Sequence, residues 1–169
     1  MLNELKKNHF FMAAAASLLT VTPVSAANVS LAIGSAESPP NNSLVQNAGA
    51  NDYFQEGINL AAQQNTASAE SAFRRAIQID PNFAEAYANL GSILANQNKL
   101  AEAIPNFQTA IRLKPNVPEF HYMFAQVLYA QNKMSEAVES VKKARDLFRS
   151  QGKTQDANSL EEVLKNMTK

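Results

Sequence analysis

The sequence repeats itself every 34 residues between residues 50 and 151. Tyr53 recurs as Tyr87, and Gly57 recurs as Gly91. The interval is kept at five more pairs of identical residues, which are Leu60 and Leu94, Ala69 and Ala103, Phe73 and Phe107, Ala76 and Ala110, and Pro81 and Pro115. A period of about 20 to 50 residues is typical of arrays in which each unit buries apolar surface against its neighbours. The sequence therefore divides into three units, 50–83, 84–117 and 118–151.

The middle unit predicts two helices joined by a short turn. Its apolar residues fall at steps of three and four, on one face formed by Tyr87, Leu90, Gly91 and Leu94 and on another formed by Ala103, Ile104, Phe107, Ala110 and Ile111. Because Gly91 and Ala103 lack bulk, we expect the two helices to approach closely there, with Tyr87 and Phe107 filling the adjoining space. The pair Gln97–Asn98 interrupts the pattern where the turn is needed.

Prolines mark the expected helix ends. Pro81 and Pro115 follow the second helices, and the residue before a proline avoids the α region. We predict a capping box at the two helix starts that follow, formed by Asn82 with Glu85 and by Asn116 with Glu119. Pro105 instead lies inside a second helix, where a proline costs about 3 kcal/mol or bends the helix. We expect it to form an outward-facing kink.

These units resemble the tetratricopeptide repeat (TPR) family. The middle unit, AEAYANLGSILANQNKLAEAIPNFQTAIRLKPN, matches the family pattern at nearly every signature site, and the first and third units match less fully. The resemblance implies an all-α fold, an α-solenoid of helix-turn-helix repeats. Stacked hairpins of this kind present a groove lined chiefly by the first helix of each unit.

The two ends of the array depart from the pattern. Glu56 stands where Leu90 and Phe124 stand in the later units, which suits an opening unit with no predecessor to cover it. At the other end, Gly152 is placed as a helix C-cap. Residues 152–169 then predict one amphipathic helix, which we expect to cap the last repeat. Packing of that helix into a partner is the alternative.

The resemblance also implies a peptide-binding groove. By position in the repeat, its residues would be Phe54 and Ile58 in the first unit, Asn89, Ser92 and Asn96 in the second, and Tyr122, Gln126 and Tyr129 in the third. Aromatic rings beside amides are typical of such surfaces. Some TPR domains clamp a terminal carboxylate with Lys, Arg and Asn, and only Asn89 matches that set. We therefore expect a segment with apolar side chains as the ligand. Packing of Phe54 or Tyr122 on neighbouring repeats is an equal alternative.

The first 49 residues do not share the repeat. Residues 1–26 have a basic start, an apolar stretch from Phe10 to Val21 and small residues at Val24–Ala26, which is typical of a cleaved signal peptide. The apolar stretch falls short of the ~20 residues that span a bilayer, so no stable membrane span is expected after cleavage. We expect export to a bacterial periplasm or a thylakoid lumen. Residues 27–49, rich in Ser, Asn and Pro, predict a disordered linker.

Composition excludes several classes of function. The 15 basic and 15 acidic residues give a formal net charge of zero, which disfavours nucleic-acid binding. With no Cys and only His9 and His121, the sequence offers no metal-ligand set and no catalytic residues, and we expect no cofactor. His121 replaces the packing residues Tyr53 and Tyr87, so we expect it to pack between helices.

The sequence therefore predicts an exported scaffold that binds protein or peptide segments in its groove, in assembly of an envelope complex. The alternative is a structural protein that self-associates as a homo-oligomer, through the groove or the C-terminal helix. A third hypothesis is a small-molecule or enzymatic role of the concave face. Late basic residues, from Lys133 to Lys153, are interpreted as a solvated helix face with ion pairs, the alternative being a patch for an acidic partner or lipid headgroups.

Overall fold

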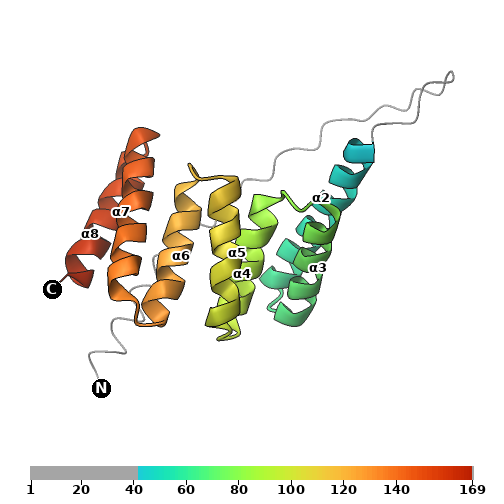
Figure 1. Ribbon diagram of the computed structural model, residues 1–169, viewed down its shortest axis with the longest axis horizontal. Helices are drawn as coiled ribbons and strands as arrows, with labels where there is room; N and C mark the ends of the chain where they lie inside the picture. Colours follow the sequence, from blue (N-terminus) through green and yellow to red (C-terminus); the bar gives the residue numbers. More distant parts are fainter. Residues whose placement is uncertain (1–41, 169) are drawn as a thin grey trace. The chain divides into compact units, whose positions relative to one another are not determined.

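The computed structural model describes residues 42–168, all of which belong to one compact unit of the chain. Within this range the protein is all-α, and no strand is present (Figure 1). The helices are α2 (Asn42–Ala62), α3 (Thr66–Ile79), α4 (Ala84–Asn96), α5 (Leu100–Leu113), α6 (Pro118–Ala130), α7 (Met134–Ser150) and α8 (Thr154–Met167). The predicted signal peptide, residues 1–26, lies outside the described residues.

The helices form three stacked hairpins and one closing helix. α2 packs against α3, α4 against α5 and α6 against α7, and each second helix also packs against the first helix of the next hairpin (Figure 1). α8 packs against α7 and buries Ala157, Leu160, Val163 and Leu164. This arrangement confirms the prediction of an α-solenoid with a C-terminal capping helix.

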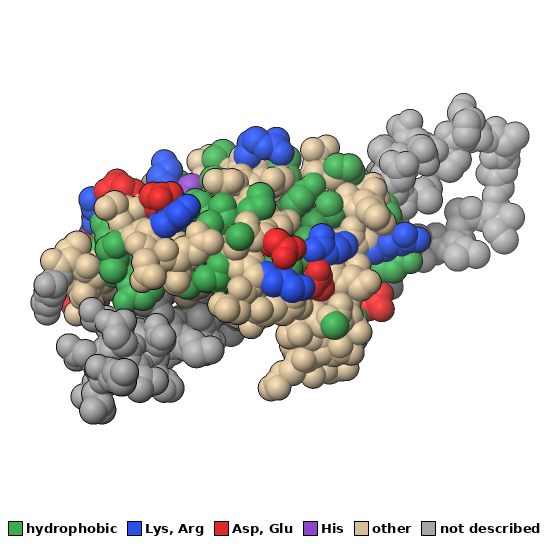
Figure 2. Space-filling model, turned by 60° about the horizontal axis from the view of Figure 1, so that its bottom comes forward, with side chains coloured by type: hydrophobic (Ala, Val, Ile, Leu, Met, Phe, Trp, Pro, Cys, Tyr) green, Lys and Arg blue, Asp and Glu red, His purple; other side chains and the backbone are tan. Residues whose placement is uncertain are grey.

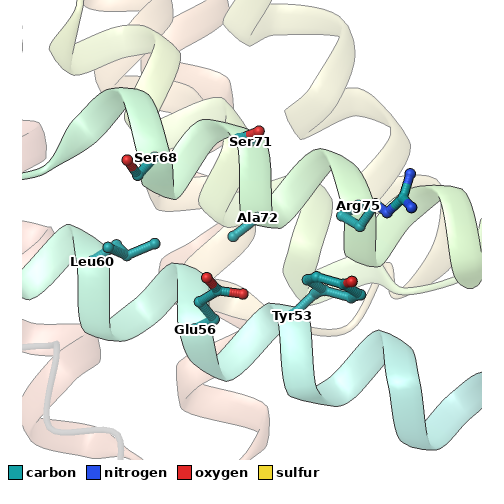
Figure 3. Close-up of a pocket in the computed structure, with 7 residues that line it drawn as sticks. All are labelled: Tyr53, Glu56, Leu60, Ser68, Ser71, Ala72 and Arg75. Atoms are coloured by element: carbon teal, nitrogen blue, oxygen red, sulfur yellow. The ribbon is translucent and has the colours of Figure 1, made fainter.

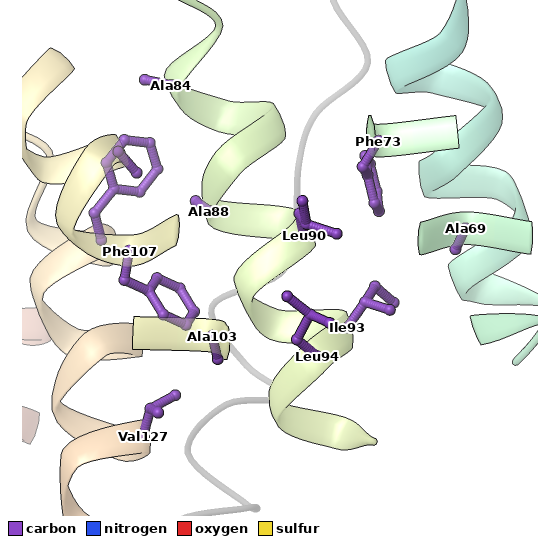
Figure 4. Packing of buried hydrophobic residues seen from close by; sticks show 12 residues of the cluster. Ala69, Phe73, Ala84, Ala88, Leu90, Ile93, Leu94, Ala103, Phe107 and Val127 are labelled. Atoms are coloured by element: carbon purple, nitrogen blue, oxygen red, sulfur yellow. The ribbon is translucent and has the colours of Figure 1, made fainter. Parts of the chain in front are cut away.

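The core runs through the contacts between hairpins. Phe73 of α3 is fully buried, and Leu90 and Leu94 of α4 are 2% and 1% exposed. In Figure 4, Phe73 and Leu90 project into the space between α3 and α4. Complete burial of a side chain of this size stabilises the folded state by about 1.5 to 3 kcal/mol. The repeated apolar positions therefore hold the hairpins to one another as well as closing each one.

Small residues allow the two helices of a hairpin to cross closely. A β-carbon at Gly91 would lie 2.9 Å from the Phe107 ring, and one at Gly57 would lie 2.6 Å from the Phe73 ring. Real β-carbons do not approach so near, because close-packed interiors leave no room for an extra methyl group. The expectation of a close approach at Gly91 is confirmed.

Each hairpin turn uses a residue with a positive φ. Gln64, Asn98 and Asn132, again spaced by 34 residues, have φ of 61°, 62° and 61°. The N–H of the following residue then bonds to a carbonyl five residues earlier, as in the 2.8 Å bond from Lys99 N to Leu94 O. This is a Schellman motif, which satisfies carbonyls at the helix end. Gly152, with φ of 75°, occupies the same position after α7, as the sequence predicted.

Two local predictions are wrong. α2 begins at Asn42, so the predicted disordered linker is wrong over residues 42–49, while residues 27–41 lie outside the described part. The predicted capping boxes do not form either, because the N-cap residues of α4 and α6 are Phe83 and Val117, with no side-chain cap. Instead, the carboxylates that would complete the boxes pair with lysines of neighbouring elements, Glu85 with Lys114 and Glu119 with Lys153.

Pro105 lies on the exposed side of α5, which continues as one helix from Leu100 to Leu113. The outward position agrees with the expectation, because the missing backbone hydrogen bond then falls on the solvent side. A kink at Pro105 stays a prediction.

Candidate functional site

The predicted binding residues lie on the first helices of the three hairpins. α4 carries Asn89, Ser92 and Asn96, and α6 carries Tyr122, Gln126 and Tyr129; the two helices contact each other. α2 carries Phe54 and Ile58. Ile58, Ser92 and Gln126 occupy equivalent positions of the three hairpins, and Phe54 and Tyr122 are equivalent in the first and third. Because α4 and α6 contact each other, they present their residues as neighbours. We call the eight residues the first-helix surface.

Phe54 and Ile58 of this surface also serve the core. The Phe54 ring lies 4.8 Å from that of Phe83 and 5.8 Å from that of Phe73, measured between centroids. Both Phe54 and Ile58 are half-buried and pack against the central apolar cluster. Substitution of Phe54 would therefore change stability as well as the surface, which favours the packing alternative for that ring.

The polar residues of α4 are tied to their own helix. Asn89 Nδ2 donates to the carbonyl of Glu85 at 2.8 Å, and Ser92 Oγ donates to that of Ala88 at 3.1 Å. Both side chains are half-buried, whereas Asn96 at the end of the helix is exposed. Asn89 is thereby held in one orientation, with its carbonyl oxygen available as an acceptor.

The residues of α6 divide into a buried and a more accessible part. Tyr122 is only 3% exposed, which favours the alternative that it packs on neighbouring repeats over that of an accessible anchor. Burial raises the pKa of its phenol, and a hydrogen bond with Gln126, one turn further along, partly offsets the rise. Gln126 and Tyr129 are partly exposed. α6 therefore contributes an amide and one phenol ring to the accessible surface.

The first-helix surface contains no ionisable carboxylate or amine. Charged residues instead gather on the second helices and the turns, where Glu70 accepts from Arg74 at 2.8 Å and lies 3.4 Å from Lys99. The hydrogen bond from Arg74 holds the pKa of Glu70 below its usual value, burial opposes this effect, and Gln97 and Lys99 reinforce it. Ionic contacts thus link successive hairpins away from the candidate surface.

Four of the late basic residues, Lys142, Arg145, Arg149 and Lys153, are paired with carboxylates. Lys142 lies 2.7 Å from Glu139, and both Arg145 and Arg149 approach Glu161, at 3.1 and 3.3 Å. On the face shown in Figure 2, some Lys and Arg side chains lie directly beside Asp and Glu, and others lie apart from them. This arrangement matches the interpretation of an ion-paired helix face.

Residues 42–168 hold no group of three His, Cys, Asp or Glu side chains that could bind a metal ion. The ring of His121 is half-buried, and its Nε2 lies 2.9 Å from the carbonyl oxygen of Pro115, in the loop between hairpins. None of the helices in this range is long and apolar enough to cross a bilayer.

A hollow that the sequence analysis did not identify lies between α2 and α3 (Figure 3). Its volume is about 470 Å³, and its lining consists of Tyr53, Glu56, Leu60, Ser68, Ser71, Ala72 and Arg75. The one available signal was Glu56, whose departure from the apolar pattern marked this side as uncovered.

Comparisons with known proteins agree with this geometry. Two family models, both described as tetratricopeptide repeat, match residues 54–118 and 94–152. No curated protein sequence matches significantly.

Among solved structures, the TPR2B domain of yeast Sti1 in a pHsp70 complex has a TM-score of 0.68 and 21% identity, with 72% of this chain and 97% of that one covered. The first TPR of Spaghetti bound to the HSP90 peptide SRMEEVD has a TM-score of 0.65 and 16% identity, covering 72% and 92%. PcrH in complex with the chaperone-binding region of PopD has a TM-score of 0.66 and 18% identity, covering 70% and 90%.

Proposed function

Because the chain belongs to the tetratricopeptide repeat family, we propose that it is a protein-interaction adaptor whose first-helix surface binds a segment of a partner protein. Two similar folds are described as bound to a peptide or to a segment of another protein, which supports this class of function. The observation that carries the proposal is the uncharged row of amide and aromatic side chains on adjacent helices α4 and α6. Such side chains bind by shape, apolar contact and neutral hydrogen bonds.

The charge of the surface indicates the chemistry of the segment. The peptide SRMEEVD in one similar structure carries three acidic residues, whereas the first-helix surface here offers no Lys or Arg to meet them. We propose an uncharged contact segment with apolar side chains. Its binding would change little with ionic strength, because screening acts on charged pairs.

Photocrosslinking tests the proposal. A photoreactive residue at Gln126 or Asn96 on the first-helix surface should capture a partner from the native source. The same residue at Gln108 or Lys142, on exposed positions of second helices, should capture none. Capture that is equal at both sets of positions would reject this surface.

A substitution gives an independent test. Tyr129→Ala should weaken binding of the captured partner while helical circular dichroism is unchanged. Phe54→Ala is a poorer probe, because the Phe54 ring also packs against Phe83 and Phe73.

We also propose that the protein is exported and acts in assembling an envelope complex. The pattern of residues 1–26 supports export, and it lies in the part of the chain that the structure does not describe. N-terminal sequencing of the mature protein should find Ala27 as its first residue. Recovery of an intact Met1 in the cytosolic fraction would contradict export.

A further inference from the structure

The outer side of the first hairpin carries the hollow between α2 and α3, and none of the eight residues of the first-helix surface lines it. We call its seven lining residues the end face. α2 contributes Tyr53, Glu56 and Leu60, and their side chains lie toward α3 in Figure 3. The end face is a second surface, separate in composition from the one proposed to bind peptides.

The repeat register shows what this face does in later hairpins. The residues equivalent to Glu56 and Leu60 in the second unit are Leu90 and Leu94, which are 2% and 1% exposed where α4 packs against α3. The part of the end face on α2 therefore corresponds to buried packing surface in the second hairpin, whereas the residues equivalent to Ser68 and Ser71 of α3, Glu102 and Pro105, are exposed. In the first hairpin Glu56 is exposed and Leu60 is half-buried, and no described helix stacks there.

The end face carries one charge of each sign. Glu56 lies on α2 and Arg75 on α3, both are exposed, and neither has an ion pair within residues 42–168. Arg75 donates to Gln78 Oε1 at 3.2 Å, and its guanidinium carbon lies 6.0 Å from the centroid of the Tyr53 ring. The face thus has a cation and a separate anion beside the half-buried side chain of Leu60, while Ala72 beneath them is buried.

A surface with one charge of each sign on opposite sides is complementary to itself. When two copies meet about a two-fold axis, Glu56 of each can face Arg75 of the other. We propose that the end face is the interface of a reversible homodimer, held by two symmetry-related Glu56–Arg75 ion pairs. Glu56 in place of Leu keeps the contact weaker than the permanent stacking inside the chain.

Charge reversal tests this pairing. Analytical ultracentrifugation of the purified protein should show a monomer–dimer equilibrium. Glu56→Arg and Arg75→Glu should each weaken self-association by about tenfold or more, because each places two like charges opposite one another. An equimolar mixture of the two variants should restore dimers, since one copy then offers two cations and the other two anions. Added salt should weaken the wild-type dimer.

Lys143→Glu is the matched control, because Lys143 occupies the position of Arg75 two units later and is exposed on α7. It should leave the dimer unchanged, and circular dichroism should show that all three variants are helical. A wild-type protein that is monomeric at the highest soluble concentration would overturn the proposal. So would a dimer that both reversals leave intact, which would place self-association on another surface.

Discussion

The second and third hairpins form the same helix crossing with different residues. In the second, Gly91 lies against Phe107, and a β-carbon at Gly91 would be 2.9 Å from the ring. In the third, the equivalent residues are Ala125 and Val141, both fully buried. The added methyl group on the first helix accompanies the loss of a ring on the second. The two pairs thus have similar combined volumes, so a change of size at one position is expected to require a compensating change at the other.

Of the changes considered at this crossing, Phe107→Val should lower the stability of the protein most. It gives the second hairpin the smaller residue of the third while Gly91 still offers no side chain, so a cavity remains. We expect the free energy of unfolding to fall by about 2 to 4 kcal/mol, as measured by urea denaturation. A fall of less than about 1 kcal/mol would show that the ring does not fill the crossing.

Gly91→Ala adds a methyl group where the crossing has no room for it. It should lower the free energy of unfolding by about 1 to 3 kcal/mol. Alanine is the better helix former by about 1 kcal/mol, so destabilisation would have to come from the clash with Phe107. Gly49→Ala is the matched control, because a β-carbon there would lie 3.8 Å from Ile79 Cδ1, an ordinary contact. The control should stabilise the protein. A stabilising Gly91→Ala would contradict the close crossing.

The double variant Gly91→Ala with Phe107→Val sharpens the comparison by copying the third hairpin's pair into the second. It should be more stable than the sum of the two single changes predicts, by about 1 to 2 kcal/mol. A double-mutant cycle from the four denaturation curves measures this coupling. Strict additivity would mean that the two positions do not share one packing volume.

Ala125→Gly in the third hairpin should have the smallest effect, a loss of about 1 kcal/mol, since it mainly removes helix propensity. The Ala125→Gly variant also provides a background in which Val141→Phe can be tested. That change should be tolerated better in the Ala125→Gly background than in the wild-type protein, as measured by thermal denaturation. If Val141→Phe destabilises the protein equally in both backgrounds, the two positions of the third hairpin do not share one packing volume.

Much of the fold was predictable because packing constraints recur along the chain. Phe73 and Phe107 are buried where the period placed them, and Gly152 has the positive φ expected of a C-cap. The start of α2 was not predictable from composition, because the segment 42–49 is rich in residues with weak helix propensity. Ala50, the residue directly after this segment, is 1% exposed, so tertiary packing holds α2 from that residue onward. Propensity is a weak guide where tertiary contacts oppose it.

The candidate site was predictable in its position but not in its accessibility. The repeat register identified the eight residues, yet only the structure shows that Tyr122 is buried and that Phe54 lies against Phe83. The capping boxes failed for a related reason. Their glutamates have lysine partners from distant turns, and the order of the sequence alone does not reveal that competition.

The amino-acid sequence by itself determined the number of hairpins, their register and the residues at each crossing. Each hairpin needs side chains of matching size where its two helices cross, so the same packing positions recur at a fixed interval along the chain. The tertiary structure alone decided where the first helix begins, which aromatic rings stay accessible, and that Glu56 and Arg75 border one hollow. Those properties depend on what surrounds a residue in space, and residues far apart in the chain supply those surroundings.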